Sequence, residues 1–350
     1  MAGRGPATIS ILGPGFTVTP LTYRRVAEAA LAVCTLIVFT GAAVRLTGSG
    51  LGCPEWPRCH GTHLTPQLSS HALIEFGNRM LTGVVSIPCL AAAILAWRRR
   101  PFRRDLALIA LLLPLGVAGQ AVLGGLTVRY GLSPSWVIAH FLLSMLLLVA
   151  CVTLAWRARF EPGERAPASD RLATWAVRAL LPLGALTIAA GTLATAAGPH
   201  AGGEGTHDVV PRLDWFGRDT LSWAIHQHGA LAATLGLCAV AVWFLLRARG
   251  VEGQVREAVT AVCVLVASQG VVGSAQYAMK LPAEIVWIHV VLAALTWLSL
   301  VWAVAAAGRL APAGAATARR ASARGEPGTR ARPPRDRARD RPARPRGTAS

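Results

Sequence analysis

The sequence predicts an all-α integral membrane protein in which eight transmembrane helices form two tandem, pseudo-symmetric four-helix bundles. Composition is the first observation, because 53% of the 350 residues are hydrophobic and only 15% are charged, whereas about a quarter of a soluble domain is charged. The second is that the apolar residues come in blocks of ~20, the length that crosses a hydrocarbon core of ~30 Å, and not in the amphipathic stripes of a soluble bundle. The third is an internal repeat.

Each apolar block is interpreted as one membrane-spanning helix, and most connections between blocks are short. The first block begins beyond residue 25 and lacks a small-residue cleavage site, so we interpret it as a retained helix and not as a signal peptide. The predicted helices cover residues 26–44, 73–96, 106–127, 134–156, 172–197, 221–246, 257–278 and 283–307.

Arginines predict the orientation of these helices. They precede the first helix and fill the connections after the second, fourth and sixth helices. If the helices alternate in direction, all these segments lie on one side, which the positive-inside rule assigns to the cytoplasm. Both termini are then predicted to be cytoplasmic. The arginines concerned are Arg24, Arg25, Arg98, Arg99, Arg100, Arg103, Arg104, Arg157, Arg159, Arg165, Arg171, Arg247, Arg249 and Arg256.

The formal net charge of +18 does not indicate that the protein binds nucleic acid. Residues 319–350 alone hold eleven arginines against three acidic residues, and nothing around them resembles a nucleic-acid-binding fold. The segment is rich in Pro, Ala and Gly, a composition that cannot build a core. We therefore predict a disordered Arg/Pro-rich cytoplasmic tail over residues 308–350, next to anionic membrane lipid.

One offset of 149 or 150 residues aligns the four helices of the first half with those of the second. Because four is an even number, both halves keep the same orientation and are related by an axis along the membrane normal. The predicted organisation is a cytoplasmic segment (1–25), an N-terminal bundle (26–156), a cytoplasmic linker (157–171) and a C-terminal bundle (172–307), followed by the tail. The matching pairs are Gly41 and Gly191, Asn78 and His228, Gln120 and Gln269, Gly124 and Gly273, and His140 and His289.

Three histidines are candidate ligands of haem iron. His140, His228 and His289 each follow a helix start by six or seven residues, which is ~10 Å below the outer surface. Ionisable residues within a membrane are functional hypotheses by default, and four-helix bundles supply axial imidazoles to haem. His228 and His289 are predicted to bind one haem and His140 a second. His226 is an alternate to His228, because the two side chains point about 200° apart on one helix.

The first outer connection contains two cysteines, Cys53 and Cys59, in a Gly/Pro-rich segment. Outside the membrane such a pair can close a small disulfide ring; a reduced pair that carries a metal is the alternative. The second helix then opens with His71, Glu75, Asn78 and Arg79 on one face. We interpret this face as part of an active site, in which Glu75 accepts a proton or stabilises positive charge. The alternative is a solvated helix start with an ion pair.

These motifs resemble the haem A synthase family. The resemblance rests on Arg45-Leu-Thr-Gly-Ser-Gly-Leu-Gly-Cys-Pro-Glu-Trp-Pro-Arg-Cys59 and on Glu75-Phe-Gly-Asn-Arg79, and it extends over roughly residues 20–307. It implies an oxidoreductase that oxidises a ring methyl of haem O to a formyl group, giving haem A for terminal cytochrome oxidase, with haem b as redox cofactor. The C-terminal half would hold haem b through His228 and His289, and the N-terminal half would hold haem O with Glu75 and His140.

The resemblance also implies a bacterial plasma membrane as location. Haem O synthase and a cytochrome oxidase assembly partner would be its partners, and a homo-oligomer is left open. One departure is Asn78, because the family commonly has Glu-x-x-His-Arg at this motif. Either His140 alone ligates the substrate iron, or His71 supplies a second imidazole. Rival functions are a transmembrane di-haem b electron carrier and a non-catalytic haem transporter or chaperone.

Overall fold

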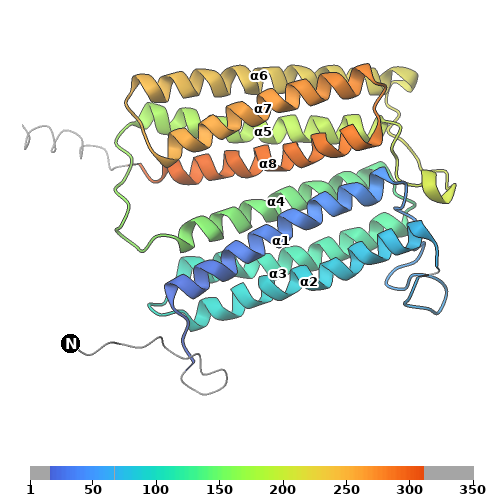
Figure 1. Ribbon diagram of the computed structural model, residues 1–350, viewed down its shortest axis with the longest axis horizontal. Coiled ribbons are helices and arrows are strands. Elements are labelled where there is room, and N and C mark those ends of the chain that lie inside the picture. Colours follow the sequence, from blue (N-terminus) through green and yellow to red (C-terminus); the bar gives the residue numbers. More distant parts are fainter. Residues whose placement is uncertain (1–15, 67, 311–350) are drawn as a thin grey trace, which may run out of the picture. The chain divides into compact units, whose positions relative to one another are not determined.

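The computed structural model describes residues 16–66 and 68–310. Within these residues it contains eight long helices, two short 3₁₀ helices and no strand, which confirms the predicted all-helical membrane fold (Figure 1). The predicted disorder of the tail concerns residues almost all of which lie outside the described part, as do residues 1–15. The helices are α1 (Pro20–Leu46), α2 (Ser70–Arg98), α3 (Arg104–Arg129), α4 (Pro134–Ala158), α5 (Arg171–Ala197), α6 (Thr220–Ala248), α7 (Gln254–Ala278) and α8 (Ala283–Ala307).

Every helix has 25 to 29 residues, so each is ~38–44 Å long and exceeds the ~30 Å hydrocarbon core. The predicted ranges fall inside the observed helices, and the added residues are mostly polar turns at the ends. For example, α1 begins at Pro20 because the hydroxyl of Thr19 accepts a hydrogen bond from the backbone N–H of Thr22 and caps the helix. The apolar pattern ends before such capped turns begin.

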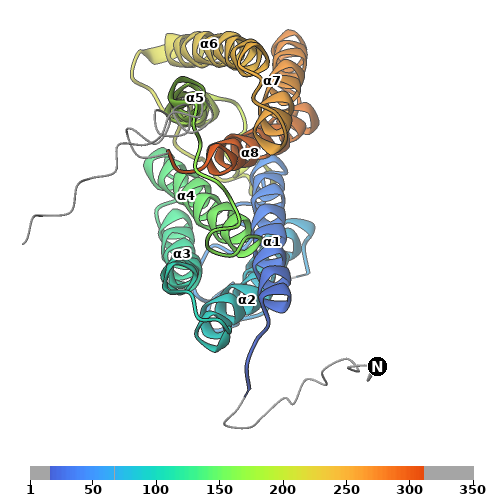
Figure 2. The ribbon, with the colours of Figure 1, turned by 90° about the vertical axis from the view of Figure 1, so that its left-hand side faces the viewer.

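Each half of the chain forms a ring of four helices. In the first ring α1 contacts α2 and α4, and α3 contacts the same two helices; in the second, α5 and α7 each contact α6 and α8 (Figure 2). The even-numbered helices of a ring therefore lie across from each other. This identical order of neighbours is what a tandem repeat would produce, while the symmetry relation and the division into functional halves stay predictions.

The two rings meet mainly where α8 packs against α1 and α4. Two indole N–H groups of α8 donate hydrogen bonds across this contact, Trp297 to the Met145 carbonyl and Trp287 to the Phe39 carbonyl, both at 2.9 Å. Outside the helices, the loop after α5 docks on the loop after α1, because the Gly50 N–H donates to the Gly202 carbonyl at 2.8 Å. The halves are thus joined both within the helices and at one end of them.

Candidate functional site

His228 on α6 and His289 on α8 face each other across the second ring. Their ring centres are 6.0 Å apart and the ring planes are inclined by 74°. One metal ion bound between two imidazoles, with metal–nitrogen bonds of about 2 Å, places the ring centres ~6 Å apart. The two side chains are therefore spaced for one shared iron. His226 is exposed and its Nδ1 lies 2.7 Å from the Ser222 carbonyl of its own helix, so it does not join this pair.

A glycine on an odd-numbered helix stands behind each candidate ligand. At three of them a side chain would press on the imidazole, so the glycine lets an even-numbered helix place its ring against its neighbour, whereas a Cβ on Gly41 would make only an ordinary contact with Asn78. Close packing against the histidines therefore explains why glycines stand at these three positions of the repeat. A Cβ added to Gly191 would lie 3.0 Å from His228, one on Gly273 would lie 3.2 Å from His289, one on Gly124 would lie 3.3 Å from His140, and one on Gly41 would lie 4.0 Å from Asn78.

Hydrogen bonds fix the ring orientation of His228 and the backbone at His140 and His289. The Nδ1 of His228 lies 2.9 Å from the Thr187 carbonyl, which only an N–H can contact favourably, so Nε2 carries the lone pair that a metal needs. The glutamine of each repeat copy donates to the backbone of the facing histidine: Gln120 Nε2 to the His140 carbonyl and Gln269 Nε2 to the His289 carbonyl, both at 3.1 Å. The repeated glutamines therefore hold α4 and α8 at the ligand positions.

Glu75 and Arg79 form a buried ion pair at the end of the first ring where α1 ends and α2 begins. The Glu75 side chain is 7% exposed, and its Oε1 lies 2.5 Å from Nη2 of Arg79. Its Oε2 accepts a hydrogen bond from the Cys53 N–H at 2.7 Å. Arg79 also donates to the backbone carbonyls of Cys53, Glu55 and Arg58. The alternative to an active-site face was an ion pair at a solvated helix start. The pair is present, but it is buried under the loop after α1.

The loop after α1 is closed by the predicted Cys53–Cys59 disulfide, which the structure contains. Trp56, between the two cysteines of this disulfide loop, places its indole against α3: a Cβ added to Gly125 would lie 2.6 Å from it. The glycine makes room for the indole. Arg79, Glu75 and Trp56 together hold the loop over the first ring.

His71 does not converge with the other residues of its helix face. Its Nδ1 lies 2.9 Å from the Ser49 hydroxyl, and its ring packs against Gly205 in the loop of the other half, where a Cβ would lie 2.1 Å away. Asn78 is two turns, or ~10 Å, further along α2. Its Oδ1 accepts a hydrogen bond from the Thr40 hydroxyl of α1 at 2.7 Å. Of the four predicted side chains, the structure joins only Glu75 and Arg79 directly.

Sequence reasoning missed Thr40, Trp56 and Thr187. Thr40 lies one residue before Gly41 of the repeat, and its counterpart in the second half is Ala190. This exchange of a hydroxyl for a methyl group, matched with the exchange of Asn78 for His228, is a signal that the repeat alignment could have provided. Trp56 and Thr187 act through packing and a backbone carbonyl, for which the sequence gives no signal.

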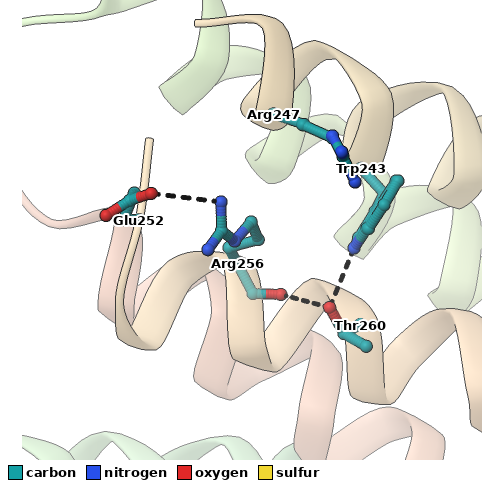
Figure 3. A pocket seen from close by; sticks show the side chains of 5 residues that line it. All are labelled: Trp243, Arg247, Glu252, Arg256 and Thr260. Atoms are coloured by element: carbon teal, nitrogen blue, oxygen red, sulfur yellow. Dashed lines mark hydrogen bonds and ion pairs between the residues drawn. The ribbon is translucent and has the colours of Figure 1, made fainter. Parts of the chain in front are cut away.

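An open pocket of about 520 Å³ lies away from the histidines, between the far ends of α6 and α7. Figure 3 shows its lining, in which the Trp243 indole N–H donates to Thr260 at 2.9 Å and Arg256 pairs with Glu252. Trp243 is 15 residues beyond His228 on α6, which is ~22 Å along the helix. The pocket therefore does not belong to the candidate site.

Known proteins resemble parts of this chain. The profile of the cytochrome oxidase assembly protein family matches residues 24–202. The heme A synthase of Lysinibacillus sphaericus is 35% identical over 130 residues, which cover 37% of this chain and 42% of that protein. Those of Bacillus pumilus and Listeria monocytogenes are 35% and 38% identical over 125 and 127 residues, each covering 35% of this chain and 40% of the relative.

The chain thus spans about two fifths of the length of the curated relatives that it matches. The region that the profile matches contains most of α1, all of α2 to α5, the disulfide loop and Glu75, whereas His228 and His289 lie beyond residue 202. Because the family profile covers just over half of the chain, the protein belongs to the cytochrome oxidase assembly protein family, and the relatives that it matches in part are named heme A synthases, the family that its motifs resemble.

Proposed function

We propose that the protein is a haem A synthase, which oxidises a ring methyl of haem O to a formyl group and so supplies haem A to a terminal cytochrome oxidase. One observation carries the proposal: His228 and His289 are spaced for a shared iron, while the equivalent places in the first ring hold His140 and Asn78. The chain would then combine a closed site for a resident cofactor with a half-open site for a substrate.

Haem b fits the second ring as that cofactor. His228 and His289 would hold its iron from facing helices, and bound haem b would supply one-electron transfer. The protein residues have defined tasks there: His228 is held in one tautomer by Thr187, and Gln269 fixes the backbone that carries His289. Both tasks restrict the ligands before any cofactor binds.

The first ring is the proposed haem O site. His140, backed by Gly124 and held through Gln120, would ligate the substrate iron. Glu75 would stabilise positive charge developing at the reacting methyl carbon or take the proton that it loses. The disulfide loop over Glu75 would exclude bulk water, which strengthens such electrostatic effects. The position of His71 in the contact between outer loops supports ligation of the substrate iron by His140 alone.

Location and partners complete the proposal. The protein is a multi-pass membrane protein, and we place it in a bacterial plasma membrane with both termini in the cytoplasm. The ligand residues then lie toward the outer leaflet, at one level. That common level speaks against a di-haem carrier, which needs haems near both surfaces. Haem O synthase and a cytochrome oxidase assembly protein are the expected partners.

The test is expression in a host that makes haem O but lacks haem A, followed by extraction of membrane haems and identification by mass and pyridine haemochrome spectrum. Haem A should appear with the wild-type chain and be nearly absent with Glu75→Gln. Glu28→Gln is a matched control, because Glu28 also forms helix ion pairs, with Arg24 and Arg159, but near the start of α1. Bound haem b without haem A would favour an electron carrier or a haem chaperone.

A further inference from the structure

Asn78 and Thr40 are a matched pair that the second ring does not have. At the positions 150 residues later stand His228 and Ala190. Glycines occupy matching positions beside the two sites, but a Cβ on Gly191 would press on His228 at 3.0 Å, whereas one on Gly41 would make only an ordinary contact with Asn78 at 4.0 Å. At the position where the second ring has the proposed ligand His228, the first ring therefore has the amide of Asn78, with the Thr40 hydroxyl beside it.

The Thr40 hydroxyl determines which end of the Asn78 amide faces α1. The Thr40 hydroxyl lies 2.7 Å from Asn78 Oδ1 and 3.2 Å from the Ile37 carbonyl. Its single proton goes to the nearer acceptor, so the oxygen end of the amide is occupied. Among the described residues, Nδ2 makes no hydrogen bond, and the side chain is only partly buried. An amide nitrogen carries two N–H donors, so Asn78 keeps a donor for a group that is not part of the protein.

The chemistry of an amide decides what that group can be. A carboxamide is a poor ligand for iron, unlike imidazole, so Asn78 leaves a coordination position open. Hydrogen-bond donors beside an open position control how haem iron binds small molecules. A leucine or valine at residue 78 would also leave the position open, but it would supply no donor and would need no hydroxyl at residue 40.

We propose that the iron porphyrin in the first ring is ligated by His140 alone and binds a diatomic ligand of the carbon monoxide and dioxygen class on the opposite side, with Asn78 Nδ2 as hydrogen-bond donor. Thr40 is the positioning residue for that donor. The inference rests on the proposed function for the presence of an iron porphyrin in this ring. It predicts that the two rings differ in reactivity: the first is open to small ligands and the second is closed by two imidazoles.

The test uses the purified full-length chain loaded with haem O and haem b, reduced and exposed to carbon monoxide. One carbon monoxide should bind per chain. Asn78→Val should keep that binding and raise the C–O stretching frequency in the infrared spectrum, because a donor near the ligand oxygen lowers it. Thr40→Val should shift the band in the same direction by less. Thr35→Val is the matched control, since its hydroxyl bonds the Leu31 carbonyl of its own helix, and it should leave the band unchanged.

A second variant closes the site. Thr40→Ala combined with Asn78→His copies the second ring, and it should abolish carbon monoxide binding while two haems stay bound. Two haems in the wild type without carbon monoxide binding would overturn this inference alone. A band that does not move in Asn78→Val, or that moves down, would also overturn it. A single haem per chain that is lost with His228→Ala would overturn the proposed function and this inference together.

Discussion

The two rings share a packing skeleton and differ in the polar groups placed on it. In both rings a glycine lies beside each proposed ligand position. In both, a glutamine donates a hydrogen bond to the backbone carbonyl of the histidine on the fourth helix of the ring. The second ring completes the pattern with two imidazoles. At the places that match Glu75 and Arg79 it has Ile225 and Gly229, so the buried ion pair is confined to the first ring. The comparison indicates that a duplicated bundle keeps its helix packing while its chemistry diverges.

The interior of the bundles shows the same division between shared packing and different residues. Cys34 and Cys89 are buried in the first ring, with their sulfur atoms 3.6 Å apart. Their counterparts are Gly184 and Ala239, and the missing volume is filled by Leu300, whose Cδ1 would lie 2.4 Å from a Cβ on Gly184. Small and large side chains thus exchange places at one level of the two rings.

The largest effect that tests the comparison is loss of haem b from the second ring. His289→Ala removes one of the two proposed axial ligands, so the affinity for haem b should fall by more than the ~10–100-fold typical of losing an outer partner of a metal ligand. The ratio of haem to protein in the purified variant, from pyridine haemochrome spectra, measures this. His226→Ala should retain haem fully, because its ring lies on the exposed side of α6. Retention of haem b by His289→Ala would break the contrast between the rings.

Next in size is the effect of Glu75 on turnover. If the carboxylate acts in proton transfer or charge stabilisation, Glu75→Gln should lower haem A formation by ~10²–10⁴-fold, with haem b content unchanged. The structure also gives Glu75 an anchoring task, since it accepts from the Cys53 N–H. A glutamine retains an acceptor for that bond, so the variant separates charge from anchoring. An undiminished rate would leave the first ring without its distinguishing chemistry.

Arg79 tests the anchoring task itself. Arg79→Met removes the donor to three loop carbonyls and leaves the Glu75 carboxylate buried without its cation, which costs ~3–5 kcal/mol for a buried pair. Faster proteolysis and hydrogen exchange of residues 53–59 should result, with haem b still bound in the second ring. A loop that stays as protected as in the wild type would show that the disulfide and Trp56 hold it without Arg79.

Much of this arrangement could be predicted from the sequence because it depends on periodicity. Apolar blocks give the helices, and one offset along the chain gives the register of His140, His228 and His289. The disulfide followed from two close cysteines in an outer loop. The contacts that the sequence did not predict are set by rotation of one helix against another. Asn78 was expected to share a site with Glu75 and His71, but its amide turns toward Thr40 on α1.

His71 illustrates the same limit. Helical spacing places it on the face of Glu75, yet its ring is drawn to Ser49 and to Gly205 in a loop more than 130 residues away. A pattern within one helix contains no information on which distant loop will cover its end. The contact between loops depends on backbone close approach at Gly48, where a Cβ would lie 2.3 Å from the Gly205 nitrogen.

The disulfide should have a moderate effect confined to the first ring. In a chain-entropy description, closing so short a loop stabilises it by about 2–3 kcal/mol. Replacing Cys53 and Cys59 by Ser should therefore speed hydrogen exchange in residues 53–59 and lower haem A formation several-fold, while haem b stays bound. An equal loss of haem b would mean that the two rings are coupled through the loop and are not independent in stability.

The smallest predicted effect on stability concerns Glu204, in the loop after α5 that docks on the loop after α1. Burial alone would raise the pKa of Glu204, but the backbone N–H groups of Gly202 and Ala201 donate to its carboxylate and hold the pKa below its ordinary value. Because the folded pKa is the lower one, this contribution is present above the unfolded value near 4.5 and disappears as the pH falls through the folded pKa.

Glu204→Gln should therefore speed hydrogen exchange of residues 200–206 at pH 7, and the difference from the wild type should vanish in acid. The carboxylate is 45% exposed, so the effect should be below ~1 kcal/mol. Glu252→Gln, an exposed ion-pair carboxylate at the far end of α6, is the control and should leave this loop unchanged. Because the N–H of Gly205 donates to the Gly48 carbonyl, a loosened loop should also expose residues 47–50 of the first ring. Exchange that rises in one loop but not in the other would show that the outer contact does not couple the rings.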